Sequence, residues 1–340
     1  MKRAALVGAA CWLLAVGAGE AREQIRVVGS GAPFAYAHMV AEQFAQSAHH
    51  RAPSLDLTGA AIGFRQFCAG VGFEYPDVNV TSRPMTVAEF SNCQQHGVAS
   101  ISEIAVGQEV LLLVNAESSP RLAITAAELF SALADRVPVN GELQVNPYER
   151  WSDIRGTLPD VAIQVMGPAP ASPSHDALMA LVMDRGCQSF ASLQQLEADR
   201  REQVCRTLRR DGAYLDGMRN EREMLQWLRD NPNAYGLMSY RWWYEEGQGE
   251  LVANPIDDVP PSEEKLSDAR YPLARPVFLY VKNQHVGQVP GLQEFLYEFT
   301  AERTIGPDGY LVDKGFVPLN DRGRNRAREA VLSLQPISRE

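Results

Sequence analysis

The sequence has few cysteines and histidines, and its basic residues form no block. It holds five cysteines and six histidines in 340 residues, without a CxxC pair or a His/Cys cluster at metal-ligand spacing. We therefore expect no structural zinc and no cofactor. The formal net charge is −10, with 32 Lys and Arg against 42 Asp and Glu. This acidity argues against nucleic acid or an anionic membrane as a partner.

Long apolar runs are missing after the N-terminus. The first 21 residues carry Lys2 and Arg3, an apolar run from Ala4 to Ala18, and then Gly19-Glu20-Ala21. This order is typical of a cleavable secretory signal peptide. No later run approaches the ~20 apolar residues that span a bilayer. We expect a mature chain that begins near Arg22 and is soluble in the periplasm.

The length and the cysteine count favour two lobes with one disulfide in each. About 319 mature residues exceed what one hydrophobic core usually supports. Four cysteines remain after residue 21, and an even number in an exported chain suggests disulfides. Their spacing favours Cys68 with Cys93 and Cys187 with Cys205, although the sequence alone does not settle this pairing.

The segment Ile25 to Phe44 contains a short apolar run, a Gly-Ser-Gly turn and then apolar residues at helical spacing. This pattern predicts a strand, a turn at Ser30 and an amphipathic helix. The unpaired N–H groups and the dipole at such a helix start favour a phosphate-like anion. An ordinary βα turn has the same pattern, so the segment alone does not decide between the two interpretations.

Two further predicted strands, residues 54–58 and 77–81, also end in glycine-containing or polar turns. Strands that alternate with helices at this spacing indicate a parallel sheet. Ligands bind beyond the carboxyl ends of such strands, where Ser30, Gly59 and Ser82 all fall. The coincidence of three strand ends favours a binding site.

The rest of the chain predicts a second lobe and a return to the first. The segment 188–220 is polar and is interpreted as a solvated helical insertion. Lobe 1 should comprise residues 22–107 and 271–340, and lobe 2 residues 108–270, with two hinge crossings. We expect strands at 99–115, 161–166 and 271–282, and helices at 86–95, 125–134, 221–229, 291–303 and 320–334.

Several segments together resemble the periplasmic phosphate-binding proteins of ABC transporters, in the type II solute-binding protein family. The match runs from about Arg26 to about Leu319. The resemblance implies an α/β, two-lobed clamshell fold in which each lobe is a mainly parallel sheet flanked by helices. It also implies uptake of inorganic phosphate or a similar oxyanion through an ABC permease in the inner membrane. The motifs are GSGAPF, GFRQFCAG, TSRPMT, NCQQHGV, RWSDIRGTLPD, NPNAYGLMSYRWWYEE and YPLARPVFLYVK.

The same resemblance implies that four loops contact the ligand. By position, the ligand-binding residues would be Ser30, Gly31, Ala32 and Phe34 in the first loop, Ala60 and Ala61 in the second, Ser82 and Arg83 in the third, and Ser172, Ser174 and His175 in the fourth.

Four positions depart from the family pattern. Ala32, Ala60 and Ala61 stand where members usually have a hydroxyl residue, and Pro173 stands where Ser-Gly-Thr has its glycine. Proline has no N–H, and losing one charge-assisted hydrogen bond of about 1.5–3 kcal/mol weakens binding roughly tenfold to a hundredfold. Alternatively, Pro173 simply opens a helix after a cap at Ser172. The departures favour a second hypothesis, a non-transport envelope protein of the same fold that has lost phosphate binding and contacts other proteins.

A catalytic function is not expected. Ser174, His175 and Asp176 are adjacent, but neighbouring positions at a helix start do not form a nucleophile, a base and an orienting acid. We therefore assign no catalytic residues.

Overall fold

The computed structural model describes residues 24–47, 50–170, 172–218 and 221–339. Residues 1–21, on which the predicted signal peptide rests, lie outside the described residues. None of the described helices is long and apolar enough to cross a membrane.

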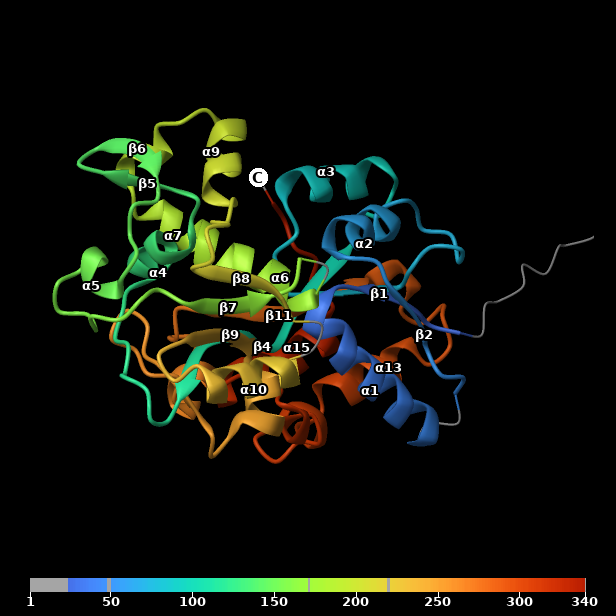
Figure 1. Ribbon diagram of the computed structural model, residues 1–340. Coiled ribbons are helices and arrows are strands. Elements are labelled where there is room, and N and C mark those ends of the chain that lie inside the picture. The colour runs from blue at the N-terminus through green and yellow to red at the C-terminus, as the bar shows by residue number, and fades with distance from the viewer. Residues whose placement is uncertain (1–23, 48–49, 171, 219–220, 340) are drawn as a thin grey trace, which may run out of the picture.

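Across the described residues, ten strands form one sheet, and helices lie on both of its sides (Figure 1). The strands at its two ends pair in parallel, as the alternating pattern predicts, whereas β4 and β11 in the middle are antiparallel to their neighbours. The main order is β2 (Ser54–Leu57), β1 (Arg26–Gly29), β3 (Val78–Thr81), β11 (Ala274–Lys282), β4 (Ile101–Ala116), β9 (Tyr235–Ser239), β7 (Val165–Pro168) and β8 (Tyr214–Met218), while β10 (Leu251–Ala253) and β12 (Val317–Pro318) pair with β4.

Strand β4 runs through both parts of the molecule. Its first part pairs with β11 and its last residues pair with β9, so one unbroken strand joins the two lobes. The apolar run EVLLLVN suits this position because the strand is buried on both faces. Gly107 lies in β4 near the point where pairing with β11 gives way to pairing with β9. The Phe316 ring packs so closely on Gly107 that a Cβ would overlap the ring.

The hydrophobic residues form two large clusters and one small one. The larger cluster contains residues from Val110 to Leu273 together with Val317. The second contains residues from Ile25 to Val106 and from Val277 to Val331. A small third cluster surrounds the cysteines at 68 and 93. Two separate cores on a shared sheet give the α/β, two-lobed architecture that was expected.

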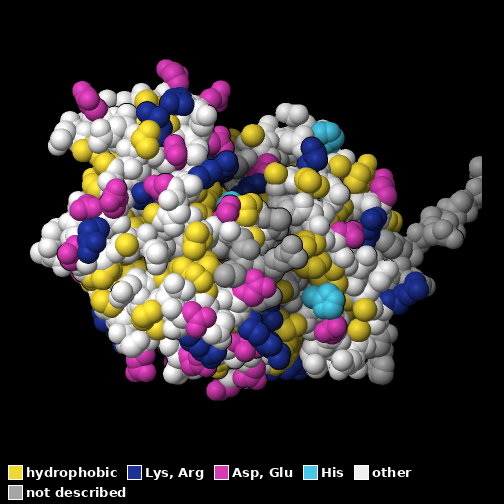
Figure 2. Space-filling view, in the orientation of Figure 1, with side chains coloured by type: hydrophobic (Ala, Val, Ile, Leu, Met, Phe, Trp, Pro, Cys, Tyr) yellow, Lys and Arg dark blue, Asp and Glu magenta, His cyan; other side chains and the backbone are white. Residues whose placement is uncertain are grey.

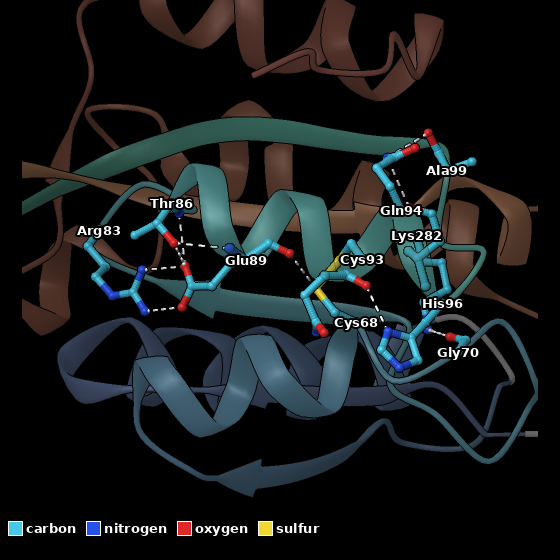
Figure 3. Close-up of a disulfide and its surroundings, with 12 residues drawn as sticks. Cys68, Gly70, Arg83, Thr86, Glu89, Cys93, Gln94, His96, Ala99 and Lys282 are labelled. Carbon is cyan, nitrogen blue, oxygen red and sulfur yellow. Dashed lines mark hydrogen bonds and ion pairs between the residues drawn. A yellow bond between two sulfur atoms is a disulfide. The ribbon is translucent and has the colours of Figure 1, made fainter. Parts of the chain in front are cut away.

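Both disulfides form as predicted. One joins Cys68, directly after α2 (Ala60–Phe67), to Cys93 in α3 (Val87–Gln95), and Figure 3 shows its surroundings. The other joins Cys187 in α7 (Arg185–Gln188) to Cys205 in α9 (Ala198–Cys205). Each bond therefore ties two neighbouring helices within one lobe.

Most predicted helices are present, and the structure shows a capping box at the start of two of them. Thr86 caps α3 together with Glu89, and Thr125 caps α4 together with Glu128. Helix α4 spans Ala126–Leu133, and β5 (Arg136–Val139) and β6 (Glu142–Val145) form a separate hairpin. The other helices are α1 (Gly31–Ser47), α5 (Trp151–Ile154), α6 (Pro173–Ala177), η1 (Leu178–Asp184), α7 (Arg185–Gln188), α8 (Ala191–Gln194), α9 (Ala198–Cys205), α10 (Glu221–Asp230), α11 (Tyr240–Trp242), η2 (Trp243–Gly247), α12 (Glu263–Ser267), η3 (Asn283–His285), α13 (Leu292–Thr300), α14 (Glu302–Ile305), η4 (Val312–Lys314) and α15 (Asp321–Ser333).

Three local predictions were wrong. The segment 188–220 is not helical throughout, because Tyr214–Met218 form β8 at one end of the sheet. Strand β7 begins at Val165, four residues later than predicted. The helix predicted at 291–303 is interrupted at Ala301, whose backbone is extended, and this splits it into α13 and α14.

Candidate functional site

The strand-end turns of the first lobe are joined by hydrogen bonds. The Ser30 N–H donates to the carbonyl oxygen of Val80 at 3.0 Å, and the Ser30 hydroxyl donates to Thr81 Oγ1 at 3.3 Å. The Arg83 N–H also donates to Thr81 Oγ1, at 3.5 Å. Ser30, Thr81 and Ser82 are all buried. Parallel pairing of β1 with β3 thus brings the first and third predicted loops together.

The second predicted loop adjoins the first. The N–H groups of Thr58 and Gly59 both donate to the carbonyl oxygen of Gly29, at 3.0 and 3.3 Å. Gly59 has a φ of 78°, which favours glycine, and Ala60 and Ala61 follow it as the first residues of α2. Since the Gly59 N–H is already bonded within the protein, this turn has one fewer donor for a ligand.

Helix α1 starts at Gly31, directly after the Ser30 turn. Gly31 has a φ of 59°, in the left-handed region where glycine is favoured. Ala32 is part of the first turn of this helix, and the partly buried Phe34 lies close to Gly29. The backbone of this helix start therefore faces the end of β1, as the sequence predicts.

Arg83 is held by Glu89 within the first lobe. Its two terminal nitrogens donate to Glu89 Oε2 and Oε1 at 2.8 and 2.6 Å (Figure 3). One of them also donates to the Pro84 carbonyl oxygen. The guanidinium lies 4.8 Å from the centre of the Phe64 ring. Burial alone would raise the pKa of Glu89, but hydrogen bonds from Arg83 and Thr86 outweigh it and hold that pKa below its ordinary value.

The fourth predicted loop belongs to the second lobe and precedes α6. Ser172 occupies the N-cap position and Pro173 the first helical position, but the Ser172 hydroxyl makes no capping bond. Ser172 Oγ and His175 Nδ1 are buried, and neither has a hydrogen-bond partner among the residues that the structure describes. The Ser172 N–H donates to the Ala169 carbonyl oxygen at 2.8 Å.

Helix α6 contacts α1, which starts in the other lobe. Figure 1 shows α6 near the centre of the molecule, beside the first turns of α1. The fourth loop therefore lies opposite the turns that carry Ser30 and Ser82. An arrangement of this kind can surround a small ligand with hydroxyl and backbone donors from both lobes.

The family of the chain follows from comparison with known proteins. A family model described as the PBP superfamily domain matches residues 15–303. The chain belongs to the PBP superfamily. The resemblance that the sequence motifs indicate is confirmed by this match and by the relatives described next.

Two relatives of this PBP superfamily protein cover most of its length. Protein SphX of Synechococcus elongatus is 25% identical over 272 residues, which are 77% of this chain and 69% of SphX. The phosphate-binding protein PstS of Staphylococcus haemolyticus is 23% identical over 267 residues, which are 77% of this chain and 71% of PstS.

Two solved structures share the fold. A possible phosphate-binding protein from Planctomyces limnophilus has a TM-score of 0.65 and 22% identity, and the match covers 92% of this chain and 98% of that one. An ABC-type phosphate transport receptor from Vibrio cholerae has a TM-score of 0.60 and 14% identity, with 86% and 99% covered.

The side chains in the described part of this PBP superfamily protein do not gather into a metal-binding cluster. No group of three His, Cys, Asp or Glu residues within that part could hold a metal ion. Among the described residues His175 Nδ1 has no hydrogen-bond partner, so no hydrogen bond to this atom links it to Ser174 or Asp176.

The sequence interpretation missed three features. Thr81, which links the Ser30 turn to the Arg83 backbone, was not singled out, although it directly precedes Ser82. The ion pair of Glu89 with Arg83 was not predicted, although the position of Glu89 six residues after Arg83 could have suggested it. The third feature is a cavity beside His175, lined mainly by residues 206–216, in the segment interpreted as a solvated insertion.

Proposed function

We propose that this protein is an exported solute-binding protein that holds phosphate or a related oxyanion between two lobes and passes it to an ABC permease. The observation that carries the proposal is the pair of unpartnered atoms Ser172 Oγ and His175 Nδ1, buried on the lobe that faces the Ser30 turn. A buried polar atom without a partner costs free energy, and a bound oxyanion would accept its hydrogen bond.

The binding residues would be mostly neutral donors. Hydroxyls of Ser30, Ser82, Ser172 and Ser174, the His175 ring and the backbone at the start of α1 could surround an anion without a block of positive charge. This is compatible with the acidic composition of the chain. The ligand would be bound and released unchanged, with no catalytic residue and no cofactor.

Closure would be a hinge motion of two lobes. We propose that lobe 1 comprises residues 22–107 and 271–340, and lobe 2 residues 108–270. The division of the two large hydrophobic clusters near Gly107 in β4 supports the first boundary. Tyr271 and Leu273 pack in the second-lobe cluster, so the clusters divide a few residues after the second boundary, near residue 275 in β11. Contacts from both lobes to one ligand would favour the closed form.

The named relatives support the ligand and the transport partner. PstS of Staphylococcus haemolyticus is named a phosphate-binding protein, and the Vibrio cholerae structure is named a phosphate transport receptor. The N-terminal sequence pattern supports export to the periplasm.

Calorimetric titration of the mature protein with phosphate, arsenate and sulfate tests this function. We expect micromolar or tighter phosphate binding, and we expect Ser172→Ala to weaken it about tenfold because one hydrogen bond to the anion is lost. The exposed Ser118 provides a matched control, since Ser118→Ala should leave the affinity unchanged. Equal affinities in the two variants would place the ligand elsewhere.

One alternative function has support of its own. Arg83 is already paired with Glu89, and the loops carry Ala32, Ala60, Ala61 and Pro173 in place of the usual donors. These features favour an envelope protein that has lost anion binding and contacts another protein. Lack of any heat signal with all three anions would support this alternative and overturn the transport proposal.

A further inference from the structure

A cavity of about 760 Å³ opens beside the fourth loop, on the second lobe. In Figure 2, Lys and Arg side chains gather between the part of the molecule that carries α9 and the part that carries α3. The cavity shares His175 and Pro170 with the α6 loop region, so it adjoins the proposed oxyanion site. Its other lining residues are Met179, Arg206, Thr207, Leu208, Arg209, Arg210, Gly212, Tyr214, Leu215 and Asp216.

Only one of the three arginines lining this cavity has no described charge partner. Arg209 is buried, pairs with Asp211 and donates to two backbone carbonyl oxygens. Arg206 pairs with Asp184 at 2.6 Å. Arg210 is exposed and makes no ion pair or side-chain hydrogen bond with any residue that the structure describes. It is therefore the cation available to a ligand.

A carboxylate and a hydroxyl complete the polar lining. Asp216 is exposed and forms no ion pair within the described part of the chain, with Arg210 or with any other cation. Tyr214 is 5% exposed, and its hydroxyl is buried without a partner among the described residues. Burial raises the pKa of Tyr214, so the hydroxyl keeps its proton and can donate.

The Tyr214 hydroxyl lies close to the fourth loop. It is packed against Gly167 at the end of β7, so closely that a Cβ at that position would overlap it. Pro168 follows and ends the strand, and the chain then leads to Ser172. The cavity and the fourth-loop region therefore share Pro170 and His175, and Tyr214 packs on the strand that leads to them.

The size of the cavity exceeds what an inorganic anion needs. Sites for small organic ligands typically enclose about 300–1,000 Å³, and this cavity falls within that range. Its lining offers a cation, a carboxylate and a hydroxyl, whereas the phosphate loops lack several usual donors. A ligand with an additional polar organic part would use these groups and recover part of the lost affinity.

We infer that the preferred ligand is a small phosphorylated hydroxy acid, with its phosphoryl group in the loops and its organic part in this cavity. The inference rests on the proposed function. The ligand carboxylate would pair with Arg210, and its hydroxyl would donate to Asp216 and accept from Tyr214. The same geometry favours a phosphorylated polyol less, because it has no carboxylate for Arg210.

Calorimetry with three probes tests this inference: inorganic phosphate, glycerol 3-phosphate and 3-phosphoglycerate. We expect 3-phosphoglycerate to bind about tenfold or more tightly than inorganic phosphate, with glycerol 3-phosphate between them. Inorganic phosphate binding equally well or better would overturn the inference and leave the proposed function intact. Lack of binding by all three would overturn the proposed function, and the inference with it.

Two variants locate the organic part of the ligand. Arg210→Gln should weaken 3-phosphoglycerate about tenfold or more, weaken glycerol 3-phosphate less, and leave inorganic phosphate within about twofold. Tyr214→Phe should weaken both esters and spare inorganic phosphate, because it removes a single hydroxyl.

Arg121→Gln is the control, since Arg121 is exposed and lies outside the cavity lining. It should change none of the three affinities. If Arg210→Gln weakened all three ligands equally, or none of them, the cavity would have no role in selecting the ligand.

Discussion

Each lobe contains a helix whose capping glutamate also binds an arginine, and the two sites differ in their position relative to the proposed ligand. In the first lobe Thr86 and Glu89 cap α3, and Glu89 holds Arg83 at 2.6 Å. In the second lobe Thr125 and Glu128 cap α4, and Glu128 holds Arg155, also at 2.6 Å.

The difference lies in what surrounds the arginine. Arg83 follows Ser82 at a strand end among the predicted ligand residues, whereas Arg155 donates to Thr157 and to the Ala123 carbonyl oxygen. An arginine also pairs with a capping glutamate at Arg155, where no ligand is proposed. The ion pair of Arg83 with Glu89 therefore needs no ligand to explain it. Arg83 alone is therefore weak support for an anion site, and the unpartnered atoms near α6 are stronger support.

Removing the disulfides should give the largest effect on stability in both lobes. We expect the double variants Cys68→Ala/Cys93→Ala and Cys187→Ala/Cys205→Ala each to lose about 2–4 kcal/mol, because the bonds restrict the unfolded chain. The bonds close loops of similar length, with sequence separations of 25 and 18, so the two losses should be similar. Urea unfolding measures both, and an unchanged midpoint in either variant would contradict this expectation.

Neutralising the two capping glutamates should separate stability from binding. Glu89→Gln and Glu128→Gln each remove a charge but keep a side chain that can still cap, so we expect a loss of about 1 kcal/mol or less. The loss should be smaller for Glu128, because the Arg155 side chain is 43% exposed and that of Arg83 is 30% exposed.

The two variants should differ in ligand affinity. Glu89→Gln releases the charge of Arg83 beside the proposed site and should strengthen oxyanion binding severalfold, whereas Glu128→Gln should leave it unchanged. Calorimetry with phosphate measures both. Identical affinities would show that Arg83 lies outside the reach of the ligand.

Acid should reduce the contribution of Glu89 and Glu128 to folding stability in the same pH range. This is the smallest of the expected effects. For Glu128, as for Glu89, burial alone would raise the pKa, but hydrogen bonds from its arginine and threonine hold it below the ordinary value of 4.5. A carboxyl with a lowered folded-state pKa contributes stability above its unfolded pKa and loses it as the pH falls through the folded value.

We therefore expect stability to decline as the pH falls below about 4.5. The decline should be shallower in a Glu89→Gln/Glu128→Gln double variant, as thermal unfolding across this range would measure. Identical pH profiles for this variant and the unmodified protein would argue against both ion pairs.

The sequence predicts the long buried strand and the capped helices of this fold well. The strand at 99–115 and the helices at 86–95 and 125–134 were recognisable because strand burial and helix capping depend on local sequence. Strand β8 was missed because it is only five residues long and its partner β7 is distant in sequence.

The site was predictable only in part. The turns at Ser30 and Ser82 could be placed together from the order of parallel strands. The unpartnered state of Ser172 Oγ, and the cavity that joins His175 to Arg210, depend on packing between segments that are far apart along the chain. No local pattern encodes such packing.

Strand β4 has a consequence for how this protein could be divided. A fragment that ended at residue 107 would stop within β4, and the remainder would begin with the apolar residues that pair with β9. Either piece would present unpaired backbone groups to other chains, which is a known cause of aggregation. The two halves are thus inseparable as folding units, and any useful biosensor or fusion protein should place its insertion in surface turns far from this strand.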